Sequence, residues 1–98
     1  MGSIREVIPF PGKSTGACFE AALSGYPKAG FTVWKKRDIA WLVMAKCFQE
    51  KIQIDSNIMV SPGGTPQLTL IISAPGLGEK ELRPYLDNIS SAIKAEIK

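Results

Sequence analysis

The sequence contains no histidine, and its two cysteines, Cys18 and Cys47, lie 29 positions apart. Without a C-x-x-C pair or an imidazole, the residues that make up a zinc site are missing. A serine or cysteine nucleophile would also lack its usual base. We therefore predict a non-enzymatic protein with no metal site, no cofactor and no catalytic residue. Both thiols are interpreted as reduced side chains that are buried like small hydrophobic groups.

Long apolar runs are also missing. The longest, at residues 39–45, has seven residues, whereas a membrane-spanning helix needs about 20. The N-terminal segment lacks the basic and apolar regions of a signal peptide, so we expect a cytoplasmic protein with no membrane span. The net charge of +3 is small for a dedicated nucleic-acid binder, which makes nucleic acid the least favoured partner.

What the sequence does contain is an ordinary globular composition, with 45% hydrophobic residues, which predicts one domain over residues 1–98. Periodic patterns predict strands at 4–10, 31–36, 39–48, 52–60 and 67–74. A hairpin loop is expected at 61–66, where proline and glycine cluster. Pro9 places the first strand at an edge or ends it early, because proline donates no ladder hydrogen bond.

Two helices are predicted. The first is capped by Ser14 or Thr15 and runs to about Ser24, with Gly25 as a left-handed cap and Pro27 preventing continuation. The second begins near residue 82, because a proline at 84 suits a first turn. Its apolar stripe consists of Leu82, Leu86, Ile89, Ile93 and Ile97. The fold class is therefore α+β, with the order β-α-β-β-β-β-α and both helices on one face of a five-stranded antiparallel sheet.

Loop lengths predict which strand residues share a face. We assume two-residue loops at 37–38 and near Glu50, and a five-residue loop at 62–66. The face under the helices then collects Trp34, Trp41, Val43, Ala45, Cys47, Ile52, Ile54, Ser56, Ile58, Val60, Leu68, Leu70, Ile72 and Ala74. The outer face mixes polar side chains with an apolar patch, which commonly marks an interface. The predicted interaction residues, for a homodimer or a protein partner, are Phe31, Val33, Leu42, Met44 and Ile71.

The order of elements resembles one repeat of the TATA-binding-protein-like arrangement. It is also similar to the helix-grip fold of START lipid-transfer domains and plant pathogenesis-related allergens. The segments that carry the resemblance are 4–14, the four strands between 31 and 74, and the stripe from 82 to 97. The helix-grip likeness implies a cavity for an apolar ligand between the sheet and the last helix, although the connection at 25–30 is short for such a fold. The residues expected to line it are Ala45, Cys47, Ser56, Leu86, Ile89 and Ile93.

Other motifs are weaker. Gly12-Lys13-Ser14-Thr15 echoes the end of a phosphate-binding loop, but Val7 stands where the first glycine belongs, so we interpret it as a turn and helix cap. Trp34 and Trp41, with lysines and arginine nearby, could stack on nucleic-acid bases. We favour a cross-strand pair that stabilises the hairpin, because the loop lengths direct both rings towards the helices. By analogy with the TATA-binding saddle, the outer face is the third candidate, as a nucleic-acid surface.

Overall fold

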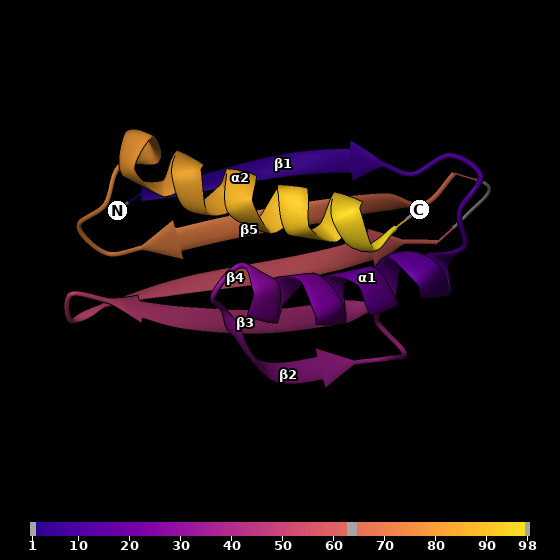
Figure 1. Cartoon of the computed structure of the whole chain (residues 1–98), viewed down its shortest axis with the longest axis horizontal. Helices are drawn as coiled ribbons and strands as arrows, with labels where there is room; N and C mark the ends of the chain where they lie inside the picture. Colours follow the sequence, from indigo (N-terminus) through magenta and orange to yellow (C-terminus); the bar gives the residue numbers. More distant parts are fainter. Residues whose placement is uncertain (1, 63–64, 98) are drawn as a thin grey trace.

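The computed structural model describes residues 2–62 and 65–97. Its elements follow the predicted order: β1 (Gly2–Pro9), α1 (Thr15–Lys28), β2 (Thr32–Arg37), β3 (Leu42–Gln49), β4 (Ile52–Ser61), β5 (Gln67–Ala74) and α2 (Glu79–Glu96). The strands form one antiparallel sheet in the order β1-β5-β4-β3-β2. Both helices lie on one face of this sheet (Figure 1), so the predicted fold class is confirmed. Neither helix combines the length and apolarity needed to cross a membrane.

Helix α1 is longer than predicted. Ser14 caps its start as expected, because the Ser14 hydroxyl accepts a hydrogen bond from the Ala17 amide at 3.0 Å. At the other end the helix continues through Gly25 and Pro27 to Lys28, so the predicted cap at Gly25 is wrong. Gly25 is needed inside the helix for another reason: a Cβ at this position would come within 2.8 Å of Ile93 Cγ1 on α2.

Helix α2 begins at Glu79, ahead of the predicted start near Leu82. Gly78 is its N-cap, and the Glu81 carboxylate accepts a hydrogen bond from the Gly78 amide at 2.6 Å. This interaction satisfies one of the amides that a helix start leaves unpaired. Pro84 consequently lies inside the helix, beyond its first turn.

The registers of the β3–β4 and β4–β5 pairs agree with the predicted faces. Cys47 pairs with Ile54 across the two-residue turn at 50–51, and Val60 pairs with Leu68. The predicted hairpin loop at 61–66 includes residues 63 and 64, which lie outside the described residues. β1 is an edge strand, as its proline suggested.

Strand β2 departs from the prediction in two ways. Arg37 pairs with Leu42, so the loop spans residues 38–41 and β3 begins three residues later than expected. A loop lengthened by two residues leaves the faces unchanged, because side chains alternate with a period of two. The second departure is a β-bulge at Trp34, between the pairs of Val33 with Ala45 and Lys35 with Met44. One extra residue reverses the faces of everything before it.

Because of the bulge, three residues lie on the opposite face from the predicted one. Phe31 is 2% exposed, and the centroid of its ring lies 5.9 Å from the centroid of the Tyr26 ring in the core. Val33 also packs against the core, so neither residue belongs to the outer face. Trp34, predicted under the helices, is 51% exposed. Trp41 stays on the helix side, where its ring meets Phe19 of α1 edge-on at 5.5 Å.

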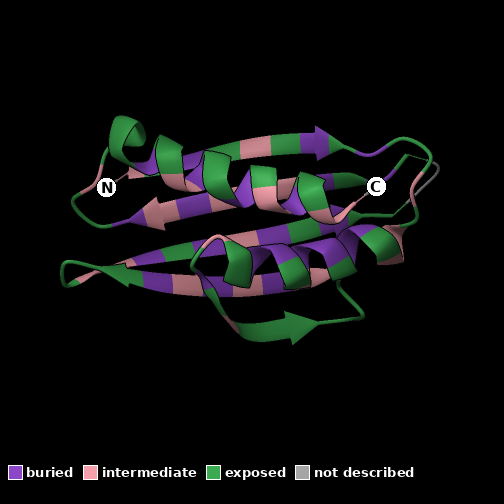
Figure 2. Cartoon of the chain, viewed as in Figure 1, coloured by how far each residue is buried: buried purple, intermediate pink, exposed green. Residues whose placement is uncertain are grey.

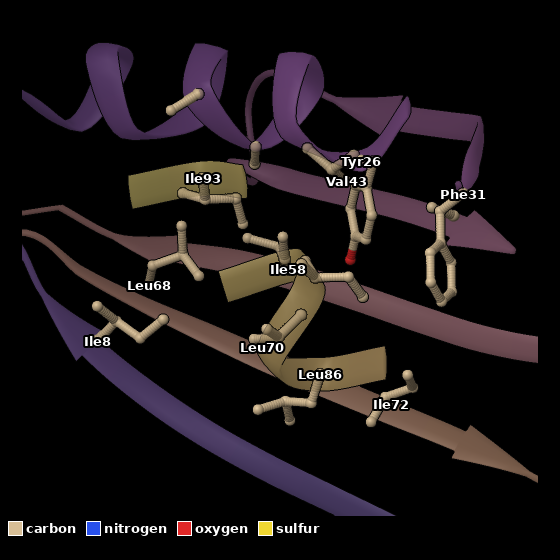
Figure 3. Packing of buried hydrophobic residues seen from close by; sticks show 14 of the residues in the cluster. Ile8, Tyr26, Phe31, Val43, Ile58, Leu68, Leu70, Ile72, Leu86 and Ile93 are labelled. Carbon is tan, nitrogen blue, oxygen red and sulfur yellow. The ribbon is translucent and has the colours of Figure 1, made fainter. Parts of the chain in front are cut away.

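A single core lies between the helices and the sheet. The buried residues of both helices lie along the sides that face the strands (Figure 2). Leu86, Ile89 and Ile93 belong to the same buried cluster as the strand residues Ile58 and Leu70 (Figure 3). Fully burying one such side chain contributes about 1.5–3 kcal/mol, so this layer provides most of the stability that holds the helices in place.

Candidate functional site

The structure brings the six predicted ligand-lining residues into one interior layer. Three come from neighbouring strands and three from one side of α2, and each is at most 8% exposed. They are Ala45, Cys47, Ser56, Leu86, Ile89 and Ile93. Ala45 and Ser56 are direct partners in the β3–β4 ladder, so two small side chains lie next to each other beneath the helices.

The hydroxyl of a buried tyrosine reaches one of these two small residues. Tyr26 of α1 is fully buried, and its hydroxyl oxygen lies 2.7 Å from Ser56 Oγ. Ser56 Oγ donates to the carbonyl oxygen of Ile71 at 3.0 Å, so the single hydroxyl hydrogen of Ser56 is already used. Tyr26 is therefore the donor to Ser56. Figure 3 shows the Tyr26 hydroxyl directed from α1 into the layer of buried side chains.

The sequence pattern did not reveal this pair. Tyr26 follows the apolar periodicity of its helix together with Phe19 and Ala22, which predicts a buried ring but no partner for its hydroxyl. The available signal was Ser56, the one hydroxyl among the inner positions of β4. A buried hydroxyl needs a hydrogen-bond partner, and the aromatic hydroxyl of the facing helix provides it.

Burial sets the protonation state of the interior groups. It raises the pKa of Tyr26 far above the usual 10.0. It also raises the pKa of the Cys18 and Cys47 thiols above 9.0. All three groups are protonated at neutral pH, so the interior offers neither a thiolate nor a phenolate. Within the described residues, no cluster of three or more potential metal ligands is found.

Two hollows on the described surface lie outside this interior layer. One, of about 440 Å³, is lined by Gly2, Ser3, Gly76, Leu77, Gly78 and Glu79, where β1 meets the connection from β5 to α2. The other, of about 620 Å³, is lined by Lys36, Arg37, Asp38, Ile39 and Ala40 at the β2–β3 loop. Neither is lined by any of the six predicted ligand-lining residues.

The outer face keeps three of its five predicted interaction residues. Leu42, Met44 and Ile71 lie half-buried on the side away from the helices. Val7, Trp34, Phe48 and Met59 are more exposed there than any of these three. Lys46 Nζ lies 5.9 Å from the centroid of the Trp34 ring. Self-association through this face stays a prediction.

The chain's likeness to known proteins is one of fold. No family model matches the sequence, and no curated protein matches it. The crystal structure of the di-domain ARO/CYC protein BexL, from the BE-7585A biosynthetic pathway, is similar over 100% of this chain, with a TM-score of 0.64 and 12% identity. The chain spans 45% of the length of that protein. The crystal structure of Ara h 8.0201 is similar over 98% of both chains, with a TM-score of 0.58 and 9% identity. These neighbours have helix-grip folds, as the element order suggested.

Proposed function

We propose that this domain binds a small ligand with an apolar body and one polar group, held between the sheet and the helices. The observation that carries the proposal is the buried pair of Tyr26 and Ser56, whose oxygens lie 2.7 Å apart. The ligand's polar group would replace the Tyr26 hydroxyl on Ser56. Its apolar body would lie against Leu86, Ile89 and Ile93.

The chemistry of the pair supports a ligand role. A tyrosine and serine in an apolar core contribute little more to stability than apolar residues of the same shape. What they add is a defined polar point in an apolar interior, and one polar group among apolar side chains is the usual composition of a small-molecule site. Ser56 remains satisfied through the Ile71 carbonyl when Tyr26 leaves, so exchange of its second partner leaves no orphaned group on the sheet.

The end of α1 provides a route for Tyr26 to move. Tyr26 belongs to the last turn of the helix, where Pro27 lacks an amide and so removes one helical hydrogen bond. The turn is closed by the Phe31 amide, which donates to the Tyr26 carbonyl at 2.9 Å, and by Gly30, whose φ is +87°. Rotation of this short segment would carry the Tyr26 and Phe31 rings together away from Ser56.

Comparison of 2-naphthol with naphthalene tests the proposal, because the two probes differ by one hydroxyl. Methyl NMR titration of the wild-type protein should give saturable shifts at Ile58, Ile89 and Ile93, with the tighter binding for 2-naphthol. Ser56→Ala should abolish the preference for 2-naphthol. Ser90→Ala removes another buried hydroxyl, on α2, and should leave the preference intact. Absence of methyl shifts at millimolar probe, or shifts confined to the outer face, would contradict the proposal.

A further inference from the structure

The β-bulge gives Trp34 a position that its sequence did not predict. Its ring lies on the outer face, 51% exposed, with Lys46 Nζ 5.9 Å from the ring centroid. Loop lengths predict a ring directed towards the helices, which argues against a stacking role for Trp34. The bulge removes that objection for Trp34, while Trp41 remains on the helix side against Phe19.

A second exposed aromatic ring lies at the same end of the outer face. Phe48 is two residues beyond Lys46 on β3, so it projects from the same side and is 63% exposed. Two residues along a strand span about 7 Å. Trp34, Lys46 and Phe48 thus form one corner, with a cation between two exposed rings. We call this corner the aromatic corner.

The outer face carries an excess of positive charge. The outward strand positions carry Arg5, Lys35, Arg37 and Lys46, and the one carboxylate among them is Asp55. Their balance equals the net charge of +3 of the whole chain. Asp55 is the only acid at these strand positions. Its carboxylate already accepts a hydrogen bond from Gln53 Nε2 at 2.8 Å. The net charge of the chain is therefore the charge of this face, since the acids lie mostly on the helix side and in loops.

We propose that the outer face binds single-stranded nucleic acid, with bases stacked on the aromatic corner and phosphates held by Arg5, Lys35, Arg37 and Lys46. Exposed rings beside cations are the combination that recognises unpaired bases, because every base has a stacking face and each nucleotide brings a negative charge. A second copy of the chain is a poorer match, because it would bring two faces of like charge together. A duplex hides its bases from the rings.

Fluorescence anisotropy with a fluorescein-labelled 12-nucleotide oligothymidylate tests the proposal on the full chain. Trp34→Ala and Phe48→Ala should each weaken binding by at least about fivefold, as expected when a stacked base loses its ring. Lys46→Gln should reduce the slope of log K against log salt by about 0.7, the value for one phosphate contact to a single strand. Both rings are exposed and Lys46 is half-buried outside the core, so all three variants should fold, which circular dichroism checks.

Matched controls come from the same molecule. Val7→Ala shortens an exposed apolar side chain at the far edge of the outer face, and Lys80→Gln removes an exposed charge from α2. Both should bind the oligonucleotide like wild type. Ser56→Ala should also bind normally, so failure of the interior-ligand proposal and failure of this one are distinguishable.

Several results would overturn the inference. One is the absence of oligothymidylate binding at 50 mM salt. Another is equal affinity for polyglutamate or for phosphatidylserine vesicles with no effect of Trp34→Ala, which would identify a general acidic partner or a membrane surface. A third is concentration-dependent dimerisation that Leu42→Lys abolishes, which would assign the face to self-association.

Discussion

Gly25 of α1 lies directly against Ile93 of α2. A Cβ at position 25 would meet Ile93 Cγ1 at 2.8 Å, Ile93 N at 3.1 Å and Ile93 Cα at 3.2 Å. A side chain on Ile93 can rotate, but the backbone of α2 cannot move without disturbing the layer beneath it. The absence of a side chain at residue 25 therefore sets the distance between the helices.

We expect Gly25→Ala to lower the free energy of unfolding by about 1–3 kcal/mol, the range for overpacking a well-filled core. This loss exceeds the gain of up to about 1 kcal/mol that alanine brings to a helix interior. Gly16→Ala is the matched control, because a Cβ at residue 16 in the first turn of α1 meets nothing within 4 Å. Urea unfolding should show Gly16→Ala neutral or stabilised. Equal stabilisation by both substitutions would show that the helices separate freely.

The Tyr26–Ser56 pair predicts unequal costs for its two partners. Tyr26→Phe leaves Ser56 bonded to the Ile71 carbonyl, so we expect a loss of about 1 kcal/mol. Ser56→Ala leaves a buried tyrosine hydroxyl without a partner, for which we expect about 2–3 kcal/mol. The double variant should cost less than the sum, and a double-mutant cycle in urea measures the difference. Strict additivity would mean that the two hydroxyls do not interact in solution.

Alkaline pH should destabilise the protein in a way that Tyr26 controls. Burial raises the folded-state pKa of Tyr26 above 10.0, so the unfolded chain loses this proton first as the pH rises. Below pH 10.0, the full contribution of the buried Tyr26 to the free energy of unfolding is present. Above it, the free energy of unfolding should fall by about 1.4 kcal/mol per pH unit for this group. Tyr26→Phe should show a correspondingly shallower decline above pH 10.0 in urea melts.

The buried thiols of Cys18 and Cys47 have raised pKa values and begin their own decline near pH 9.0, which Tyr26→Phe should leave unchanged. Replacing Cys18 or Cys47 by alanine should remove part of that earlier decline. Parallel curves for the wild-type protein and Tyr26→Phe between pH 10 and 12 would contradict the assignment to the tyrosine.

The sequence was sufficient for the element order and for most of the core, because these depend on periodicity. The inner positions of β3, β4 and β5 followed from the alternation of side chains and from the number of residues in the connecting loops. Trp34 could not be assigned in this way, since no local signal marks a bulge and one extra residue reverses a face. Gly25 was misread for a related reason: a glycine suits a helix end as well as a helix contact, and the contact partner lies 68 residues away.

The β3–β4 turn contains two residues in an unfavourable backbone conformation. Glu50 and Lys51 have φ values of +49° and +72°, in the left-handed region that glycine and asparagine tolerate best. Because Gln49 pairs with Ile52, these two residues form a two-residue hairpin loop. We expect Glu50→Asn with Lys51→Gly to raise the free energy of unfolding by about 1 kcal/mol. Thermal unfolding measures the gain, and Gly76→Ala, at φ +80°, should show the opposite sign.

The pairing of β1 with β5 joins residue 2 to residue 74 in one ladder. During synthesis, the first strand is completed long before its neighbour exists, and so is the helix that follows it. Ile4 and Ile8 cannot pair with β5, and their apolar side chains stay in water, until the fifth strand leaves the ribosome. β2, β3 and β4 close through short loops, so the nascent chain can assemble that meander first. The edge strand made earliest is therefore the one added late, and contacts so distant in sequence make folding slow.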